Sequence, residues 1–364
     1  MARRRRARYA YVPDYAVPPG ATLQETIDSL GMTQRDLALR TGMSAKTINE
    51  IIKGKAPITP DTSVLLERVT GVPARMWNNL ETNYREQLAR LADRQRLEAD
   101  LAWLGRVPTK ELVKRGVIEA PPDKVSLLHA VLRFFGVGSS EQWQQVWMQP
   151  AGAFRKSAKF QAEPEAVATW LRLGELAAQK VTTQAYHKAK LRAALHEIRK
   201  LTVEPPVVFQ TRMVGLAAAA GVAVVFVPEI KKCPICGVAR WLTPEKALIQ
   251  LSLRYKTDDQ FWFSFFHEAG HILNDPKKEI FIEDDDNRDA DRNADRFAAD
   301  FLIPRGHRPV WTTLTSRPAI ERFASSIGVA PGIVLGRLQK ENIVPWATML
   351  NDLKRHFKWK ANDE

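Results

Sequence analysis

His267-Glu268-Ala269-Gly270-His271 lies at the centre of an apolar segment that spans residues 262–273. Residues four apart share one face of a helix, so both imidazoles can bind the same cation while Glu268 lies beside the open coordination position. A metal held by three protein ligands keeps a water molecule and lowers the pKa of that water. The spacing therefore predicts a Zn²⁺ site with Glu268 as the general base. The alternative is that His271 is an ordinary hydrogen-bonded core histidine.

A second helix is predicted over residues 289–302, and it offers a third metal ligand. Asp291 and Asp295 lie four residues apart on it, so they share one face. We predict that Asp291 is the third ligand and that Asp295 orients a ligating histidine through its other ring nitrogen. The acidic run 283–286 could substitute for Asp291, although such a run more often stays in water.

The residues before the motif predict an α+β domain. A helix expected over 209–220 is followed by the β-branched run 222–227 and by two strand-like segments, 239–242 and 247–253. The third strand comes directly before the motif helix and could line a substrate cleft. We therefore predict an α+β domain that carries the metal motif over residues 205–309.

The whole chain of 364 residues is too long for one ordinary core, and we predict a multidomain, mainly α-helical protein. Its expected parts are a basic arm and linker over residues 1–20, a Cro/repressor-like helix-turn-helix bundle over 21–85, a helical middle region over 86–204, the α+β domain, and a helical C-terminal segment over 310–364.

Residues 34–51 fit the helix-turn-helix template. Leu37 and Ala38 pack within the first helix, Gly42 permits a left-handed turn, and Ser44 caps the second helix, whose buried face carries Ile48, Ile51 and Ile52. Its opposite face should meet base edges in the major groove, and the more distal lysines should meet phosphates. The predicted DNA-contacting residues are Gln34, Ser44, Ala45, Lys46, Thr47, Asn49, Lys53 and Lys55. Two helices joined by a glycine turn also occur in proteins that never touch DNA.

The formal net charge of +13 predicts a polyanionic partner, and double-stranded operator DNA is the leading candidate. Arg3, Arg4, Arg5, Arg6 and Arg8 either enter the minor groove or form a solvated tail, and no apolar run follows them as a secretion signal requires. The longest apolar stretch, 213–227, is shorter than the roughly 20 residues of a membrane span. Neither a secreted protein nor a membrane partner is expected.

The chain has two cysteines, Cys233 and Cys236. Their number excludes a disulfide framework and suits a reducing compartment, so we predict a cytoplasmic protein. Their spacing is that of half a structural zinc site, but a plain turn is the favoured interpretation because the other two ligands are missing nearby. Near the C-terminus, residues 323–338 suggest a further pair of helices, which we expect to pack against a neighbouring domain rather than contact DNA.

The stretch from Gly31 through Pro60, followed by Gly71-Val72-Pro73-Ala74 and Trp77, resembles HigA-type (Xre/Cro-like) antitoxins. The resemblance covers about residues 20–85. It implies a repressor fold that dimerises on a palindromic operator, and it suggests a toxin partner.

The segment from Trp262 to Leu273, together with Ala294-Asp295-Arg296-Phe297-Ala298 and Leu302-Ile303-Pro304, resembles the ImmA/IrrE metallopeptidase family. The resemblance spans about residues 205–305 and implies a zincin-like α+β metallopeptidase domain that binds Zn²⁺. Some members of the family cleave a helix-turn-helix repressor. The family usually has glutamate at the position of Asp291, so this chain departs from it there.

Two functional hypotheses follow. The first is a DNA-binding transcriptional regulator whose zinc-dependent endopeptidase domain cleaves a repressor or toxin partner, or the chain itself. The alternative is an antitoxin or repressor whose peptidase-like domain is catalytically inactive and serves as a sensor or a toxin-docking platform. The shorter side chain of Asp291 favours the alternative.

Overall fold

The computed structural model describes residues 15–152, 163–277, 281–282 and 288–360, and it divides the chain into unit 1, residues 1–101, and unit 2, residues 102–364. Both units are mainly helical, and unit 2 contains one four-stranded mixed sheet. This agrees with the prediction of a mainly α-helical multidomain protein with an α+β part. The arginine arm and the acidic run 283–286 lie outside the described residues.

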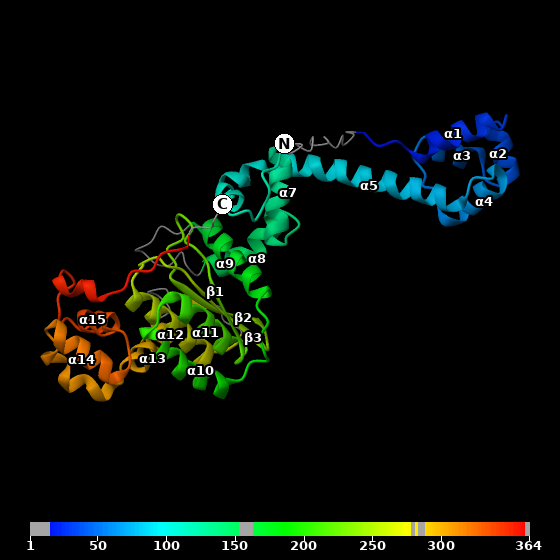
Figure 1. Ribbon diagram of the computed structural model, residues 1–364. Helices are drawn as coiled ribbons and strands as arrows, with labels where there is room; N and C mark the ends of the chain where they lie inside the picture. Colours follow the sequence, from blue (N-terminus) through cyan, green and yellow to red (C-terminus); the bar gives the residue numbers. More distant parts are fainter. Residues whose placement is uncertain (1–14, 153–162, 278–280, 283–287, 361–364) are drawn as a thin grey trace, which may run out of the picture. The chain divides into compact units, whose positions relative to one another are not determined.

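Unit 1 is a bundle of helices (Figure 1). Leu23, Leu37, Ile48, Leu66 and Trp77 form its core, and none of their surface is exposed to solvent. Its helices are α1 (Pro19–Ser29), α2 (Gln34–Thr41), α3 (Ala45–Ile52), α4 (Pro60–Thr70) and α5 (Ala74–Ala99).

Both ends of unit 1 differ from the predicted domain boundaries. Helix α1 begins at Pro19 because proline suits the first helical turn, and Pro19 and Gly20 are buried rather than part of a linker. Helix α5 continues past residue 85 as far as Ala99, and the contacts within the chain divide it after Leu101. Residues 102–204, 205–309 and 310–364 belong to a single compact unit.

Unit 2 begins with helices and a short 3₁₀ segment, and the described part of residues 102–204 contains no strand. In its first part four aromatic rings pack in tilted or edge-to-face pairs with ring centroids 5.4–6.2 Å apart, namely those of Trp103, Phe135, Trp143 and Trp147. The elements are η1 (Leu101–Gly105), α6 (Thr109–Lys114), α7 (Lys124–Phe135), α8 (Ser140–Gly152), α9 (Pro164–Gln179), α10 (Lys188–Lys200), η3 (Leu201–Val203) and α11 (Pro206–Ala218).

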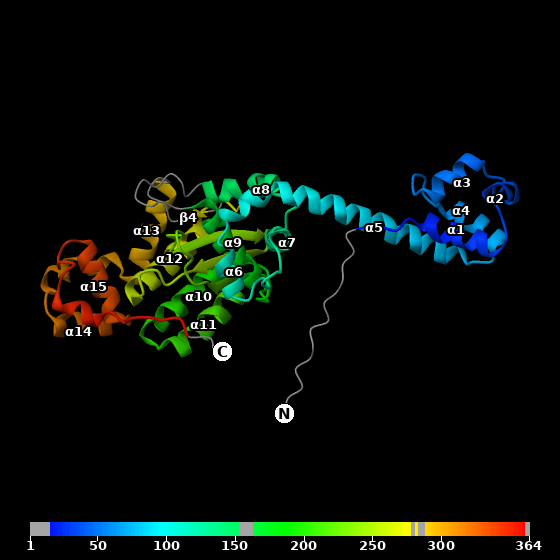
Figure 2. The same ribbon diagram turned by 90° about the horizontal axis from the view of Figure 1, so that it is seen from above.

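The sheet has the strand order β1-β3-β2-β4, with β1 parallel to β3 and the other pairs antiparallel. Its strands are β1 (Val222–Phe226), β2 (Gly237–Thr243), β3 (Lys246–Leu251) and β4 (Phe281–Ile282), and Figure 2 shows β4 at the edge. Val222, Val224 and Ile249 face the core with α11, while Gln250 on the opposite face donates a hydrogen bond to the Trp170 carbonyl of α9. Helices therefore cover both faces of the sheet, which explains its nearly continuous burial.

Helix α12 (Asp258–Asn274) lies against the sheet and carries the histidine motif. Its first turn is held by the C-terminal segment, because Asp258 accepts a hydrogen bond from the Arg355 amide at 3.1 Å and Asp259 pairs with Lys354 at 2.7 Å. Burial and the neighbouring Asp259 carboxylate raise the pKa of Asp258 to about 6. The start of the motif helix is thus fixed by residues near the end of the chain.

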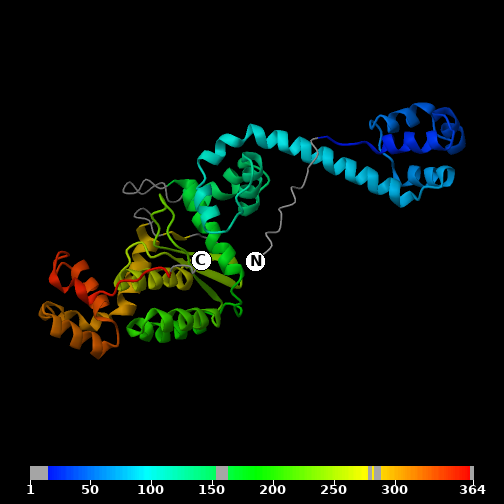
Figure 3. The same cartoon turned by 45° about the horizontal axis from the view of Figure 1, so that its top comes forward.

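The last elements are α13 (Arg288–Leu302), η4 (Arg305–Thr313), α14 (Arg317–Ile327), α15 (Pro331–Lys340) and η5 (Met349–Leu353), and the orange and red helices α14 and α15 pack together (Figure 3). Ile333, Val334 and Leu338 are buried on α15, and this helix contacts α12. This agrees with the expectation that the pair packs against its neighbours. Within the described residues, no helix combines the length and the apolar character needed to cross a membrane.

Candidate functional site

The two histidines of α12 lie with their ring nitrogens face to face. His267 Nε2 and His271 Nε2 are 3.0 Å apart, and both side chains are almost fully buried. Asp291 Oδ1 of α13 lies 3.5 Å from His271 Nε2, and one ligand atom from each of the three residues falls within 4.8 Å of the others. These three residues thus form a candidate metal site between α12 and α13, helices that pack closely against each other.

Each imidazole has a carboxylate at its other nitrogen. Asp295, the predicted orienting residue, places Oδ1 2.9 Å from His267 Nδ1. Sequence reasoning missed the second contact, in which Asp275 Oδ2 lies 2.6 Å from His271 Nδ1. Asp275 follows the last residue of α12 and lies four positions after His271, so that spacing was the available signal.

Burial lowers the pKa of His271, but the nearby Asp291 and Glu268 carboxylates outweigh it, and the net pKa is raised. Asp291 and Asp275 are both largely shielded from solvent, with 14% of each side chain exposed, whereas 54% of the Asp295 side chain is exposed. The orienting contact to His271 is therefore the less screened of the two.

Glu268 points from α12 toward the start of β2, and none of its surface is exposed. A Cβ atom added at Gly237 would lie 2.7 Å from Glu268 Oε1, so only glycine allows the strand to approach this carboxylate so closely. One residue farther along, Val238 and Ala239 pair with β4. The edge of β2 beside Glu268 is thus already paired with β4.

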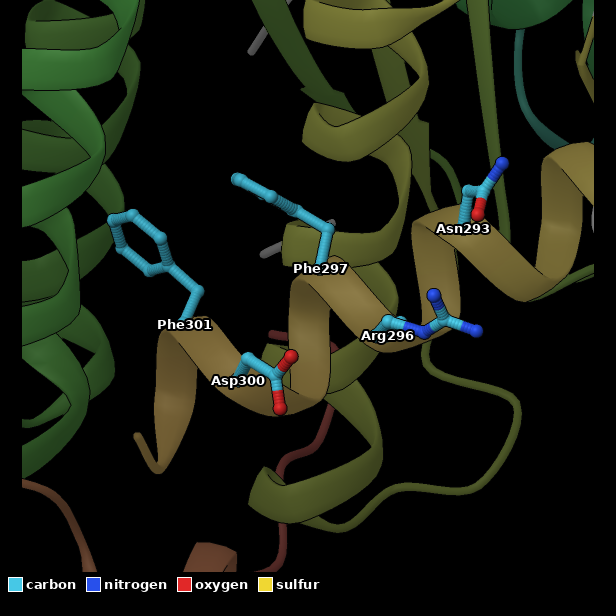
Figure 4. A pocket seen from close by; sticks show the side chains of 5 residues that line it. All are labelled: Asn293, Arg296, Phe297, Asp300 and Phe301. Atoms are coloured by element: carbon cyan, nitrogen blue, oxygen red, sulfur yellow. The ribbon is translucent and has the colours of Figure 1, made fainter. Parts of the chain in front are cut away.

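A hollow of about 360 Å³ lies on α13, lined by Asn293, Arg296, Phe297, Asp300 and Phe301 (Figure 4). None of these residues belongs to the candidate metal site. The Phe297 ring lies 5.3 Å from that of Phe301 and packs toward Gly270 of α12. The hollow is therefore a separate surface feature.

The two cysteines lie in the loop between β1 and β2 and are not joined by a disulfide. Burial raises the pKa of Cys233 to about 12, so its thiol stays protonated at neutral pH. Among the described residues, no cluster of three metal-ligating side chains includes either cysteine.

In unit 1, helices α2 and α3 are joined by a turn at Gly42. Gly42 has φ 73° between α2 and α3, and the Ser44 hydroxyl accepts a hydrogen bond from the Thr47 amide at 3.0 Å. Ile48 and Ile51 are buried, while Ile52 is only half-buried. The local signals for turn and cap thus produce the predicted geometry.

The predicted DNA-contacting residues differ in their contacts within unit 1, and Lys46 pairs with Glu50 at 3.9 Å. Ala45, Lys46, Asn49 and Lys53 share the outer side of α3, and the Asn49 side chain has no hydrogen bond within the described part of the chain. Others are already engaged in local contacts: Gln34 donates to Gln24 at 2.7 Å, and the hydroxyls of Ser44 and Thr47 lie 2.8 Å apart. Lys55 is exposed just after α3.

Comparisons with known proteins match both parts of the chain. Residues 23–77 match a helix-turn-helix family, and residues 238–329 match the IrrE N-terminal-like domain. The chain is 33% identical over 63 residues to the uncharacterized HTH-type transcriptional regulator YddM of Escherichia coli K12, covering 17% of this chain and 67% of YddM. It is 35% identical over 75 residues to virulence-associated protein I of Dichelobacter nodosus, covering 20% and 69% of the two chains.

Among solved structures, the chain is similar to the Pseudomonas aeruginosa antitoxin HigA with the higBA promoter, at 26% identity and a TM-score of 0.22, covering 24% of this chain and 95% of HigA. The family matches and the curated relatives are what assign the two domains. The chain belongs to the helix-turn-helix transcriptional regulators through residues 23–77, and it carries an IrrE N-terminal-like domain at residues 238–329.

Proposed function

We propose that this protein is a DNA-binding transcriptional regulator whose unit 2 is a zinc-dependent endopeptidase that cleaves a regulatory protein partner or the chain itself. The observation that carries the peptidase half is the 3.0 Å approach of His267 Nε2 to His271 Nε2. The DNA-binding half is supported by the exposed outer side of α3 and by the helix-turn-helix match.

The hydrogen bonds at Nδ1 of His267 and His271 explain why the close approach of their Nε2 atoms indicates a cation site. In the neutral tautomer that donates from Nδ1 to Asp295 and to Asp275, each imidazole has its lone pair at Nε2. Two lone pairs and the Asp291 carboxylate then converge on one buried point, where they repel each other unless a cation lies between them. Two imidazoles and one carboxylate are a donor set that Zn²⁺ accepts at a catalytic site.

When bound, Zn²⁺ would polarise the scissile carbonyl and make the attacking water more acidic. The Glu268 carboxylate would take the proton of that water and pass it to the leaving amine. An extended substrate peptide would pair with the outer edge of β2, the position that β4 holds, so β4 has to leave before cleavage.

On the DNA side, Ala45, Lys46 and Asn49 are proposed to meet base edges, while Lys53 and Lys55 meet phosphates. The HigA-type resemblance supports two finer proposals, a homodimer on a palindromic operator and a role as an antitoxin. We also propose that the protein acts in the cytoplasm, where its two thiols stay reduced.

A second function has its own support. Glu268 and His271 are fully buried, and Asp291 is one methylene shorter than the glutamate usual in the ImmA/IrrE family. A catalytically inactive peptidase-like domain with such a closed surface would act as a sensor or a docking platform without hydrolysis. This candidate needs neither a bound metal nor the proton transfer by Glu268.

Metal content tests the site directly. Elemental analysis of the full chain is expected to find about one zinc per chain in the wild type and almost none in His267→Ala or Asp291→Ala, because a three-ligand site loses most of its affinity with any ligand. Asn293→Ala, on the same helix as Asp291 but outside the site, is the control and should keep its zinc. A zinc-free wild type would exclude the zinc peptidase and favour the catalytically inactive sensor or docking domain.

Asp275 is expected to strengthen metal binding without touching the metal. Asp275→Ala frees His271 Nδ1 and should weaken zinc binding by about 10–100-fold, measured by competition with a chromophoric chelator. Asp275→Asn should restore part of the affinity, because its amide oxygen still accepts the hydrogen bond. If Asp275→Ala binds zinc as tightly as the wild type, the contact does not orient the ligand.

A further inference from the structure

Helices α10 and α11 form a basic surface on unit 2 that neither of the two domain matches includes. They lie side by side below the sheet in Figure 1 and contact each other. Residues 188–218 contain six lysines and arginines but only two glutamates. Five of the cations are exposed to solvent: Lys188, Lys190, Arg192, Lys200 and Arg212.

The pattern of burial on α10 distinguishes a cation that stabilises the fold from cations that only face solvent. Leu191, Leu195 and Ile198 face the core, while Lys188, Arg192, His196 and Lys200 recur every four residues along one exposed side, about 6 Å apart. Arg199 is the exception, because its guanidinium donates to the Leu302 and Ile327 carbonyls and so serves the fold. The exposed cations have no such role.

Little negative charge balances this surface. Within the described residues, no carboxylate lies within ion-pairing distance of Lys188, Lys190, Arg192 or Arg212. Glu197 is the one acid on α10, and Lys200, Arg212 and His196 all lower its pKa. Lys188 and Lys190 also lie in the first turn of α10, where the helix dipole disfavours positive charge, so they do not stabilise the helix.

The positive charge of the chain is not concentrated on the described part of the helix-turn-helix unit. The described residues of unit 1 contain 11 lysines and arginines and 11 aspartates and glutamates, so the helix-turn-helix unit is electrically neutral there. Affinity for DNA depends largely on neutralised phosphates, and the positive excess of the chain lies on the N-terminal arm and unit 2.

We propose that the exposed side of α10 and α11, namely Lys188, Lys190, Arg192, Lys200 and Arg212, is a second DNA-binding surface that contacts the phosphate backbone without reading sequence. The inference rests on the proposed DNA-binding function. DNA fits better than an acidic protein, because a protein interface needs an apolar centre. Among the described residues of 188–218, the exposed large apolar side chains are those of Val203 and Val207.

The test compares the full-length wild type with Lys188→Gln/Lys190→Gln/Arg192→Gln on a random-sequence 30-base-pair duplex. Fluorescence anisotropy over a range of salt concentrations should show at least about 10-fold weaker binding at 0.1 M salt and a salt slope reduced by about 2–3. The matched control, Lys110→Gln/Lys114→Gln/Lys124→Gln, removes the same charge from exposed sites on α6 and α7 and should change neither value by more than half as much.

The outcomes separate this inference from the proposed function. Equal losses in the two triple variants would overturn the α10 surface and leave DNA binding by α3 intact. A wild type that binds no duplex would overturn both. A third outcome is that poly-glutamate peptide displaces the labelled duplex as well as unlabelled DNA of equal charge does, and that the wild type and the control bind this peptide but the α10 variant does not. In that case the surface is a protein-docking site and the proposal is wrong.

Discussion

Replacing Glu268 with glutamine is expected to slow peptide-bond cleavage by about 10²–10⁴-fold while zinc content stays at the wild-type level. Glutamine has the same shape as glutamate but cannot take the proton of the attacking water. The fit at Gly237, where a Cβ would lie 2.7 Å from Oε1, requires that shape to be kept, so glutamine is a better test than alanine. The assay follows self-cleavage on gels and cleavage of a proteome-derived peptide library by mass spectrometry.

The control for this experiment is Glu245→Gln, an exposed glutamate in the turn between β2 and β3. It should cleave as the wild type does. Cleavage by Glu268→Gln at the wild-type rate would contradict the role of general base. Absence of cleavage in the wild type, with zinc present, would favour the sensor or docking function instead.

The sequence was sufficient to predict those parts of the candidate site whose geometry a single helix determines. His267 and His271 come together because helical periodicity puts residues four apart on one face. Asp291 belongs to another helix, so its approach depends on the packing of α12 against α13, which no local pattern encodes. We selected it by residue type and spacing, and the structure places it 3.5 Å from His271.

The contact of Asp275 with His271 was not predicted from the sequence. It follows the end of α12, and helix ends are the least predictable part of a sequence-based assignment. The same limit applies to the boundary expected at residue 85, because α5 continues without a break to Ala99. The local signals at Gly42 and Ser44 were sufficient because turn and cap chemistry act within a few residues.

Gly20→Ala is expected to destabilise the helix-turn-helix bundle by about 1–3 kcal/mol, although alanine is usually the better helix former. Gly20 lies in the first turn of α1, at the point where α1 crosses the end of α3. An added Cβ would lie 2.2 Å from the Ile51 carbonyl oxygen and 2.3 Å from Ile52 Cα. These are backbone atoms, so a side-chain rotation cannot relieve the overlap and the two helices must separate.

Hydrogen exchange by mass spectrometry measures the effect within unit 1 alone. Amides of α1 and α3 should exchange about 5–150-fold faster in Gly20→Ala, which corresponds to that loss of stability. Gly215→Ala is the matched control, because Gly215 is a helical glycine in α11 with no atom within 4 Å of the added Cβ, and it should slow exchange in α11. The two substitutions are chemically identical and differ only in what the new methyl group meets. If both slow exchange in their own helices, helix propensity rather than the close approach of α1 to α3 governs Gly20.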